Sequence, residues 1–221
     1  MTFVAILKKN LSKQANAQIA TKQEAYMRNQ FHYMGITKPV QGKITRDVAK
    51  QCPVQTHSQL VECVDQLWKQ PEREYQYAAI DVTKLNKKLW QPSSLKLFEK
   101  MIRSKSWWDT VDPLSSDCVG GLIDKFPELV VVMDQWIEDE HLWIRRSAII
   151  FQLMWKQKTD EKRLFDYCSK RMHETDFFIR KAIGWALRQY SKTNRQAVAV
   201  FVEKNKLTLS PLSLREASKY L

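Results

Sequence analysis

Two side chains in the segment 106–113 have types and a spacing that could do chemistry. If the segment is helical, Trp108 and Asp112 lie one turn apart on the same face. The carboxylate attracts a nearby cation, and so does the face of the indole ring. Such a pair suits a reaction that builds positive charge on its substrate. The structural alternative is that Asp109 or Asp112 caps a helix and that both Trp107 and Trp108 lie in the core.

A second set of residues forms a basic stripe with a tryptophan in its middle. Lys181, Trp185, Arg188 and Lys192 follow one another at spacings of four, three and four, which places them on one face of a helix. The opposite face of that helix is mainly apolar, with Ile179, Ile183, Ala186, Leu187 and Tyr190. We therefore expect Lys181, Arg188 and Lys192 to contact an anionic partner. In the alternative reading, Trp185 fixes the stripe to a neighbouring helix.

The composition indicates which kind of fold positions these residues. The chain has 221 residues, of which 44% are hydrophobic and 27% charged, as in a globular protein. It has only 5 glycines, and it contains neither GxGxxG nor GxxxxGK[ST]. Sheet-rich and doubly wound folds need glycine at turns and close approaches. The sequence therefore favours helices joined by short turns, and it excludes a glycine-rich phosphate loop.

Helical periodicity runs along most of the chain, and the helices repeat. We expect helices within residues 4–34, 44–51 and 58–69, with Thr56 or Ser58 as the cap of the third. Residues 129–137 are expected to form a helix that is packed on both sides. Aromatic residues recur about every 33–35 positions, which is typical of stacked two-helix repeats. These repeated positions are Tyr75, Trp108, Trp143 and Phe178.

The predicted fold class is therefore an all-α, HEAT-like helical-repeat solenoid with a basic concave groove, formed by a single domain over residues 1–221. In such a solenoid the repeats share one core, so Tyr75, Trp143 and Phe178 are expected to pack between layers. Trp108 is the exception, because its pairing with Asp112 points to chemistry.

The charge of the chain is strongly uneven. The net charge is +12, from 36 Lys and Arg against 24 Asp and Glu. Residues 141–221 hold 17 basic and 7 acidic side chains, a net of +10, which leaves +2 for residues 1–140. A positive field concentrated in one part of the chain attracts a polyanion, and nucleic acid is the expected partner. The alternative is a basic surface that serves solubility.

Metal and membrane functions find no support in the sequence. Cys52, Cys63, Cys118 and Cys168 form no CxxC and pair with no histidine at metal spacing. The four histidines are scattered, so we expect neither a metal nor a cofactor. The apolar run at residues 3–7 is too short for a signal segment or a membrane span. The expected protein is cytoplasmic and monomeric, and its four cysteines are expected to be reduced.

Three stretches of the chain carry a resemblance to a known family. They are residues 106–112 (SWWDTVD), 143–149 (WIRRSAI) and 177–188 (FFIRKAIGWALR). On these motifs the chain resembles the DNA alkylation repair family of bacterial, AlkD-like DNA glycosylases, which are built from HEAT-like repeats. The resemblance extends from about residue 25 to about residue 204.

The resemblance implies roles for particular residues. The catalytic aspartate of the family falls on Asp112, its two cleft tryptophans on Trp108 and Trp185, and its cleft arginine on Arg146. Tyr26 is similar to a further cleft tyrosine near the lesion. The family is also known for gripping the DNA backbone beside the lesion without a pocket for a flipped base.

One position departs from the family pattern. The family tends to have an arginine two residues after the proline of its N-terminal Gly…Pro motif, whereas here Pro39 is followed by Val40 and Gln41. The departure concerns a backbone contact near the N-terminus and leaves the expected active site unchanged.

The expected function is removal of cationic alkylated purines, of the 3-methyladenine and 7-methylguanine type, from double-stranded DNA. No lysine nucleophile is evident, so a monofunctional glycosylase that uses water is expected. Two alternatives stay open: a non-catalytic helical-repeat module that binds nucleic acid or an acidic protein, and an RNA-acting protein. A pure scaffold has no use for a carboxylate such as Asp112 beside DNA phosphates, which separates it from an enzyme.

Overall fold

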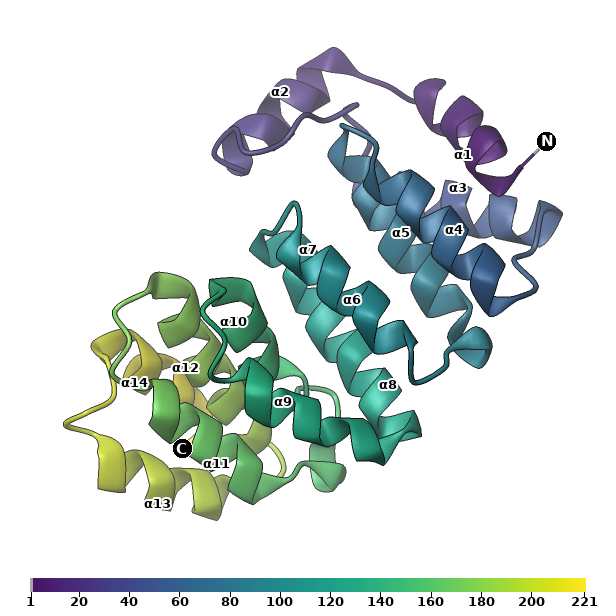
Figure 1. Cartoon of the computed structure of the whole chain (residues 1–221). Helices are drawn as coiled ribbons and strands as arrows, with labels where there is room; N and C mark the ends of the chain where they lie inside the picture. Colours follow the sequence, from purple (N-terminus) through teal and green to yellow (C-terminus); the bar gives the residue numbers. More distant parts are fainter. Residues whose placement is uncertain (1) are drawn as a thin grey trace. The chain divides into compact units, whose positions relative to one another are not determined.

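The computed structural model describes residues 2–221, and these residues are helical with no β-strand (Figure 1). The only strand-like pairing among them is an isolated bridge between His32 and Glu72. The chain divides into two compact units, which meet in sequence between Ser93 and Ser94. No helix within the described residues has the length and the apolar character that a membrane crossing requires.

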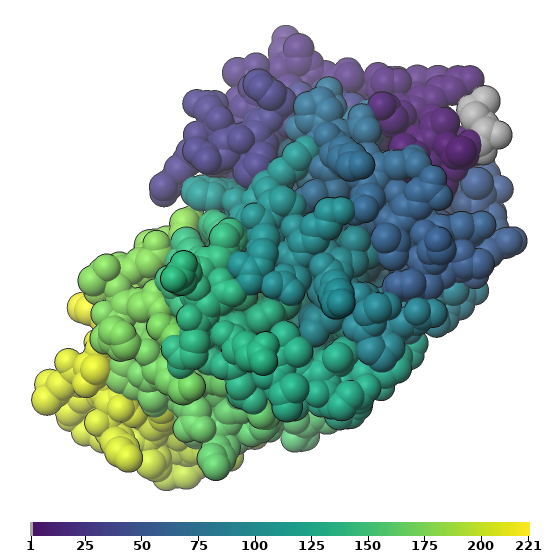
Figure 2. All heavy atoms as spheres, viewed as in Figure 1, coloured from purple at the N-terminus to yellow at the C-terminus, as the bar shows by residue number. Residues whose placement is uncertain are grey.

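The first unit ends at Ser93 and contains five α-helices. They are α1 (Phe3–Ser12), α2 (Ala17–Tyr26), α3 (Lys38–Gln51), α4 (His57–Trp68) and α5 (Arg73–Leu85). The second unit, Ser94–Leu221, contains α6 (Ser94–Arg103), α7 (Trp108–Pro113), α8 (Gly120–Lys125), α9 (Val130–Trp136), α10 (Leu142–Ile150), α11 (Glu161–Arg171), α12 (Phe177–Ser191), α13 (Arg195–Asn205) and α14 (Pro211–Ala217). Figure 2 shows the end of the chain, in yellow, at one extremity of this second unit.

Most of the helices expected in the first unit are confirmed, with shifted ends. The expected helix at 44–51 begins earlier, at Lys38, because Pro39 sits in the first turn, where a missing N–H costs nothing. Thr56 caps α4 by accepting a hydrogen bond from the Gln59 amide at 3.2 Å, whereas Ser58 lies inside that helix. Residues 4–34 form two helices followed by an extended segment.

A buried carboxylate in the first unit holds this extended segment, which follows Tyr26. Glu74 is fully buried and accepts hydrogen bonds from the amides of Met34, Gly35 and Ile36, each at 3.0 Å. Gly35 has a φ of +85°, and a side chain there would collide with the Asn16 carbonyl oxygen. The segment is therefore fixed by backbone contacts that only glycine permits.

The helix expected over residues 129–137 is confirmed, but it is packed on one side. A 3₁₀ turn at Pro127–Leu129 leads into α9, in which Met133 and Trp136 are buried. Val131 is 59% exposed. The helix that contains the three valines therefore packs against the core on one side, and not on both sides as expected.

The aromatic repeat is confirmed at the three positions that were expected to pack in the core. Tyr75 and Trp143 are buried, and the half-buried Phe178 packs on Trp143 with ring centroids 4.8 Å apart. Next to the fourth position, the half-buried Trp107 joins this cluster, with its ring 5.7 Å from Trp143 and 5.1 Å from Phe178. Trp107 is the extended N-cap of α7, and Trp108 is the first residue of that helix.

Candidate active site

A cavity of about 320 Å³ in the second unit gathers most of the predicted site residues. Its walls come from α7, α10 and α12, and they are formed by Trp108, Asp112, Arg146, Phe177, Phe178, Lys181, Trp185 and Arg188. All four predicted catalytic residues and two of the predicted DNA-binding residues therefore border one space.

The helix that carries Asp112 changes its hydrogen-bonding register directly after this residue. Pro113 has no N–H to donate to a preceding carbonyl, and the chain continues as a π-helical turn over Leu114–Val119 before α8. Hydroxyl groups supply donors at this point: Ser115 Oγ donates to the Val111 carbonyl at 2.6 Å, and Ser116 Oγ to the Asp112 carbonyl at 2.9 Å. Single π-turns of this kind occur frequently at functional sites.

The reading of Asp109 or Asp112 as a helix cap is wrong. The N-cap of α7 is Trp107, and no side chain caps this helix end. Asp109 lies in the first turn, and Asp112 lies one turn further along. The Asp112 side chain is thus available for contacts outside its own helix.

Asp112 forms a bidentate ion pair with Arg146. Arg146 donates from Nε to Asp112 Oδ1 at 2.8 Å and from Nη2 to Oδ2 at 2.9 Å. Its third nitrogen, Nη1, donates to the Phe178 carbonyl at 2.5 Å, and the side chain is only 3% exposed. All three nitrogens of Arg146 are therefore engaged within the protein, two of them with the carboxylate, which leaves this buried side chain unsuited to hold a phosphate.

Burial raises the pKa of the Asp112 carboxyl above its ordinary value, although the hydrogen bonds and the charge of Arg146 oppose this shift. A carboxylate in such surroundings is poorly hydrated, so its charge acts strongly on a nearby cation. The pair thus provides an oriented anion at the edge of an aromatic cavity.

Lys181 and Arg188 border the cavity on either side of Trp185, and both are bound to an acid that the sequence analysis missed. Glu216, on α14, forms an ion pair with Lys181 Nζ at 2.9 Å and accepts a hydrogen bond from Arg188 Nη1. Lys219 Nζ reaches the same carboxylate at 3.0 Å. These three cations, led by the hydrogen bond from Lys181, lower the pKa of Glu216 to about 2.

Gly184 explains how Glu216 comes so close to α12. A Cβ atom at residue 184 would lie 2.5 Å from the Glu216 Cβ and 2.9 Å from the Ser213 carbonyl oxygen. Only glycine therefore allows α14 to pack this tightly on α12. The single glycine in the middle of a helical stretch was the one sequence signal for this contact.

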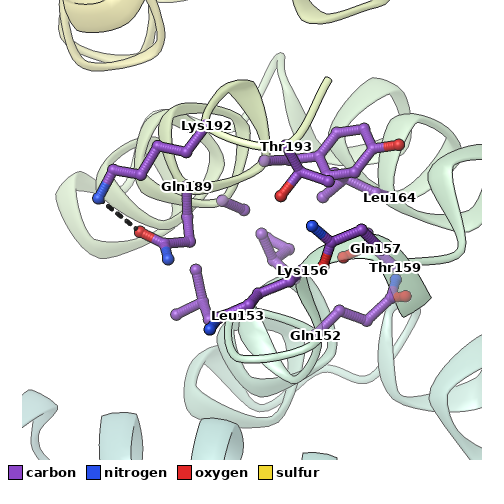
Figure 3. Close-up of a pocket in the computed structure, with 12 residues that line it drawn as sticks. Gln152, Leu153, Lys156, Gln157, Thr159, Leu164, Gln189, Lys192 and Thr193 are labelled. Atoms are coloured by element: carbon purple, nitrogen blue, oxygen red, sulfur yellow. Dashed lines mark hydrogen bonds between the residues drawn. The ribbon is translucent and has the colours of Figure 1, made fainter. Parts of the chain in front are cut away.

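Lys192 lies apart from the Asp112 cavity. It borders a neighbouring cavity of about 210 Å³ between α10, α11 and α12, where its ammonium donates to Gln189 Oε1 at 3.1 Å (Figure 3). It also lies 5.2 Å above the centre of the Tyr220 ring. The predicted stripe therefore divides, with its first three residues at the Asp112 cavity and Lys192 beyond it.

Two positions singled out in the sequence, Tyr26 and Gln41, belong to the first unit. Tyr26 is the last residue of α2 and is 72% exposed. Gln41, at the departure from the family pattern, is fully buried and donates to Thr45 Oγ1 at 2.9 Å and to Asp81 Oδ2 at 3.1 Å. Gln41 therefore takes part in a hydrogen-bond network within the first unit.

The sequence analysis also missed Phe177 at the cavity. This residue is 55% exposed and begins α12, directly after the cap Asp176, whose Oδ1 accepts hydrogen bonds from the Phe178 and Ile179 amides.

No cluster of three or more potential metal ligands occurs among the residues that the structure describes.

Comparisons with known proteins agree with this fold. The family model for "DNA alkylation repair enzyme" matches residues 7–221, and the chain belongs to this family. A solved structure described as a predicted DNA alkylation repair enzyme from Enterococcus faecalis is 35% identical, with a TM-score of 0.87 over 94% of this chain and 96% of that one. Membership of the family gives the protein a role in DNA repair, with DNA as its partner.

Two more distant structures share the fold. AlkD2 from Streptococcus mutans is 15% identical, with a TM-score of 0.65 over 91% of this chain and 99% of that one. The smu.31 protein from Streptococcus mutans UA159 is 14% identical, with a TM-score of 0.63 over 92% and 98% of the two chains. The comparison with curated proteins gave no match. The predicted all-helical repeat fold is confirmed by these likenesses.

Proposed function

We propose that this protein is a monofunctional DNA glycosylase that hydrolyses the N-glycosidic bond of cationic alkylated purines, of the 3-methyladenine and 7-methylguanine type, in duplex DNA. The observation that carries the proposal is the Asp112 carboxylate, which Arg146 holds through two hydrogen bonds of 2.8 and 2.9 Å beside Trp108 and Trp185. This arrangement supplies an oriented anion and an aromatic wall in one cavity.

The chemistry of the lesion matches these groups. A purine alkylated at N3 or N7 is already positively charged, so it leaves without a general acid. The bond between C1′ and the base nitrogen breaks, its electron pair neutralises the base, and positive charge grows on the sugar. A fixed carboxylate near C1′ stabilises that charge, because it is already oriented before the reaction begins.

Each residue of the cavity has a part in this proposal. Asp112 faces the developing cation and orients a water molecule, whose oxygen forms a bond to C1′ while its proton is released to the solvent. Trp108 and Trp185 present ring faces that tolerate a cation. Arg146 fixes the carboxylate, and the cations of Lys181, Arg188 and Lys192 meet DNA phosphates. Tyr26 is proposed to contact DNA near the lesion.

The wider proposal is that the two units act as one DNA-binding domain with a basic concave groove, as a monomer in the cytoplasm and without a metal or cofactor. Its support is the net charge of +10 on residues 141–221 together with a family match that extends over both units. A scaffold that only binds DNA would share the basic residues but would gain nothing from Asp112.

The direct test is incubation with duplex DNA that carries a single 7-methylguanine, scored for the release of free base by chromatography. Duplexes that contain uracil or hypoxanthine are the controls, because these neutral bases leave poorly without a pocket that activates them. We expect release of the methylated purine alone. Efficient release of uracil would contradict selection by the charge of the lesion.

A further inference from the structure

Glu216 is an unexpected residue to find beside a cavity that faces DNA, because a carboxylate repels phosphate groups. Its side chain is only 4% exposed, and it contacts three cations, Lys181, Arg188 and Lys219. The four charges sum to +2, so the cluster still attracts an anion. The Glu216 carboxylate is thus almost fully covered, and its charge is compensated by the cations that contact it.

The geometry of α12 gives this contact a specific consequence. Lys181, Trp185 and Arg188 follow one another at spacings of four and three, so the two cations lie on either side of the indole along one helix face. Both are held to the two oxygens of one carboxylate, Lys181 on Oε1 and Arg188 on Oε2. Glu216 therefore braces the part of α12 that borders the cavity.

We propose that Glu216 is a positioning residue that holds Lys181 and Arg188 in the orientation in which they meet the DNA backbone, and that it makes α14 part of the DNA-binding site. The inference rests on the proposed function, because it takes the Asp112 cavity to face DNA. Long basic side chains lose rotational freedom when they bind a phosphate, and a carboxylate that orders them beforehand reduces this loss.

The test is a double-mutant cycle on DNA binding, with Glu216→Gln, Lys181→Ala and the double variant of the full chain. Binding to an undamaged duplex is measured by fluorescence anisotropy. One phosphate contact contributes about eightfold to affinity at 0.1 M salt, so Lys181→Ala should weaken binding by about that factor in the wild-type background. In the Glu216→Gln background the same change should weaken it by less than about threefold, because the ammonium is no longer oriented.

Glu216→Gln by itself should change the dissociation constant by less than about threefold, because loss of orientation and loss of a repulsive charge oppose each other. Its single-turnover rate of base release at saturating enzyme should fall about tenfold. This split between affinity and rate separates positioning from a general loss of structure, which would lower both.

Glu174→Gln is the matched control. Glu174 accepts two hydrogen bonds of 3.0 Å from Arg145 in the same unit, and neither residue borders the cavity. Its binding and rate should equal those of the wild type. If melting curves show that Glu216→Gln is unfolded at the assay temperature, Glu216→Asp replaces it, because it keeps the charge and withdraws the carboxylate by one methylene.

Additive effects of the two substitutions on binding would overturn the inference, and so would an unchanged rate for Glu216→Gln. A wild-type protein that binds the duplex but releases no base would refute the proposed glycosylase activity. The binding cycle would still decide whether Glu216 positions Lys181, so the two proposals fail separately.

Discussion

Replacement of Asp112 by asparagine removes one charge and almost no volume. In the structure, Arg146 donates to both carboxylate oxygens of Asp112. An asparagine oxygen can keep one of these two contacts, but its amide group presents N–H donors to the second nitrogen of Arg146. Because Arg146 is only 3% exposed, water cannot fully replace the lost acceptor.

The expected magnitudes follow from these contacts. Loss of one preorganised electrostatic partner typically lowers a catalytic rate about 10²–10³-fold. Removal of a whole partner from a buried ion pair lowers the free energy of unfolding by about 3–5 kcal/mol. Because asparagine retains one contact with Arg146, we expect Asp112→Asn to lower it by about 1–3 kcal/mol. Affinity for undamaged DNA should be unchanged or slightly higher, because a charge that repels phosphate is gone.

The assay is single-turnover release of 7-methylguanine at saturating enzyme, together with a melting curve by circular dichroism for each variant. Glu174→Gln is again the control, since Arg145 holds Glu174 through Nε and Nη2 just as Arg146 holds Asp112. This control should melt earlier but release base at the wild-type rate. An Asp112→Asn variant that releases base as fast as the wild type would remove Asp112 from the mechanism.

The remaining predictions concern pH, salt and packing. Burial raises the pKa of Asp112 above 3.8. Base release should decrease as the pH falls through this pKa, because only the ionised carboxylate stabilises the cation. A rate that is constant down to pH 3.8 would contradict this. The folded pKa of Glu216 is lowered from 4.5 to about 2, so its stabilising contribution is complete above pH 4.5 and is lost towards pH 2. The difference in Tm between the wild type and Glu216→Gln should therefore shrink over this interval, and a difference that does not vary with pH would count against the ion cluster. If DNA binding uses about six to ten phosphate contacts, affinity should fall about 10³–10⁵-fold between 50 and 200 mM salt, and a flat dependence would favour a protein partner. Gly184→Ala should lower Tm and the rate of base release together, because a Cβ 2.5 Å from the Glu216 Cβ forces α14 away from α12; an unchanged melting curve would show that this helix pair can yield.

The fold was predictable because helical repeats leave a periodic signal in the sequence. Tyr75, Trp143 and Phe178 recur at a fixed interval, and two of them are buried while the third packs on its neighbour. At the fourth position two tryptophans are adjacent, and Trp108, which was excepted from the core because of its spacing from Asp112, borders the same cavity as Asp112. The packing of Trp107 on Trp143 and Phe178 was not predicted, because it depends on the extended backbone of the N-cap, about which residue type carries no information.

The candidate site was predictable where its residues share one helix. The spacing of Lys181, Trp185 and Arg188 predicts their common face, and all three border the same cavity. Lys192 has the correct spacing but lies at the next cavity, because a single helix face can serve two different neighbours along its length. The pairing of Arg146 with Asp112 joins helices 34 residues apart in sequence, and only the family resemblance suggested that they share a site.

Charge counting predicted the sign of the field but not the arrangement of the charges that produce it. Of the 17 basic side chains in residues 141–221, three share the single carboxylate of Glu216, and Arg146 is engaged with Asp112. The cations that border the cavity are therefore held in place by acids. If only the net charge is considered, each acid lowers the affinity for DNA. The contacts indicate instead that Glu216 and Asp112 fix the positions of the cations that they bind. An enzyme that must hold a strand in register beside one carboxylate requires such order, and a protein that only attracts a polyanion does not.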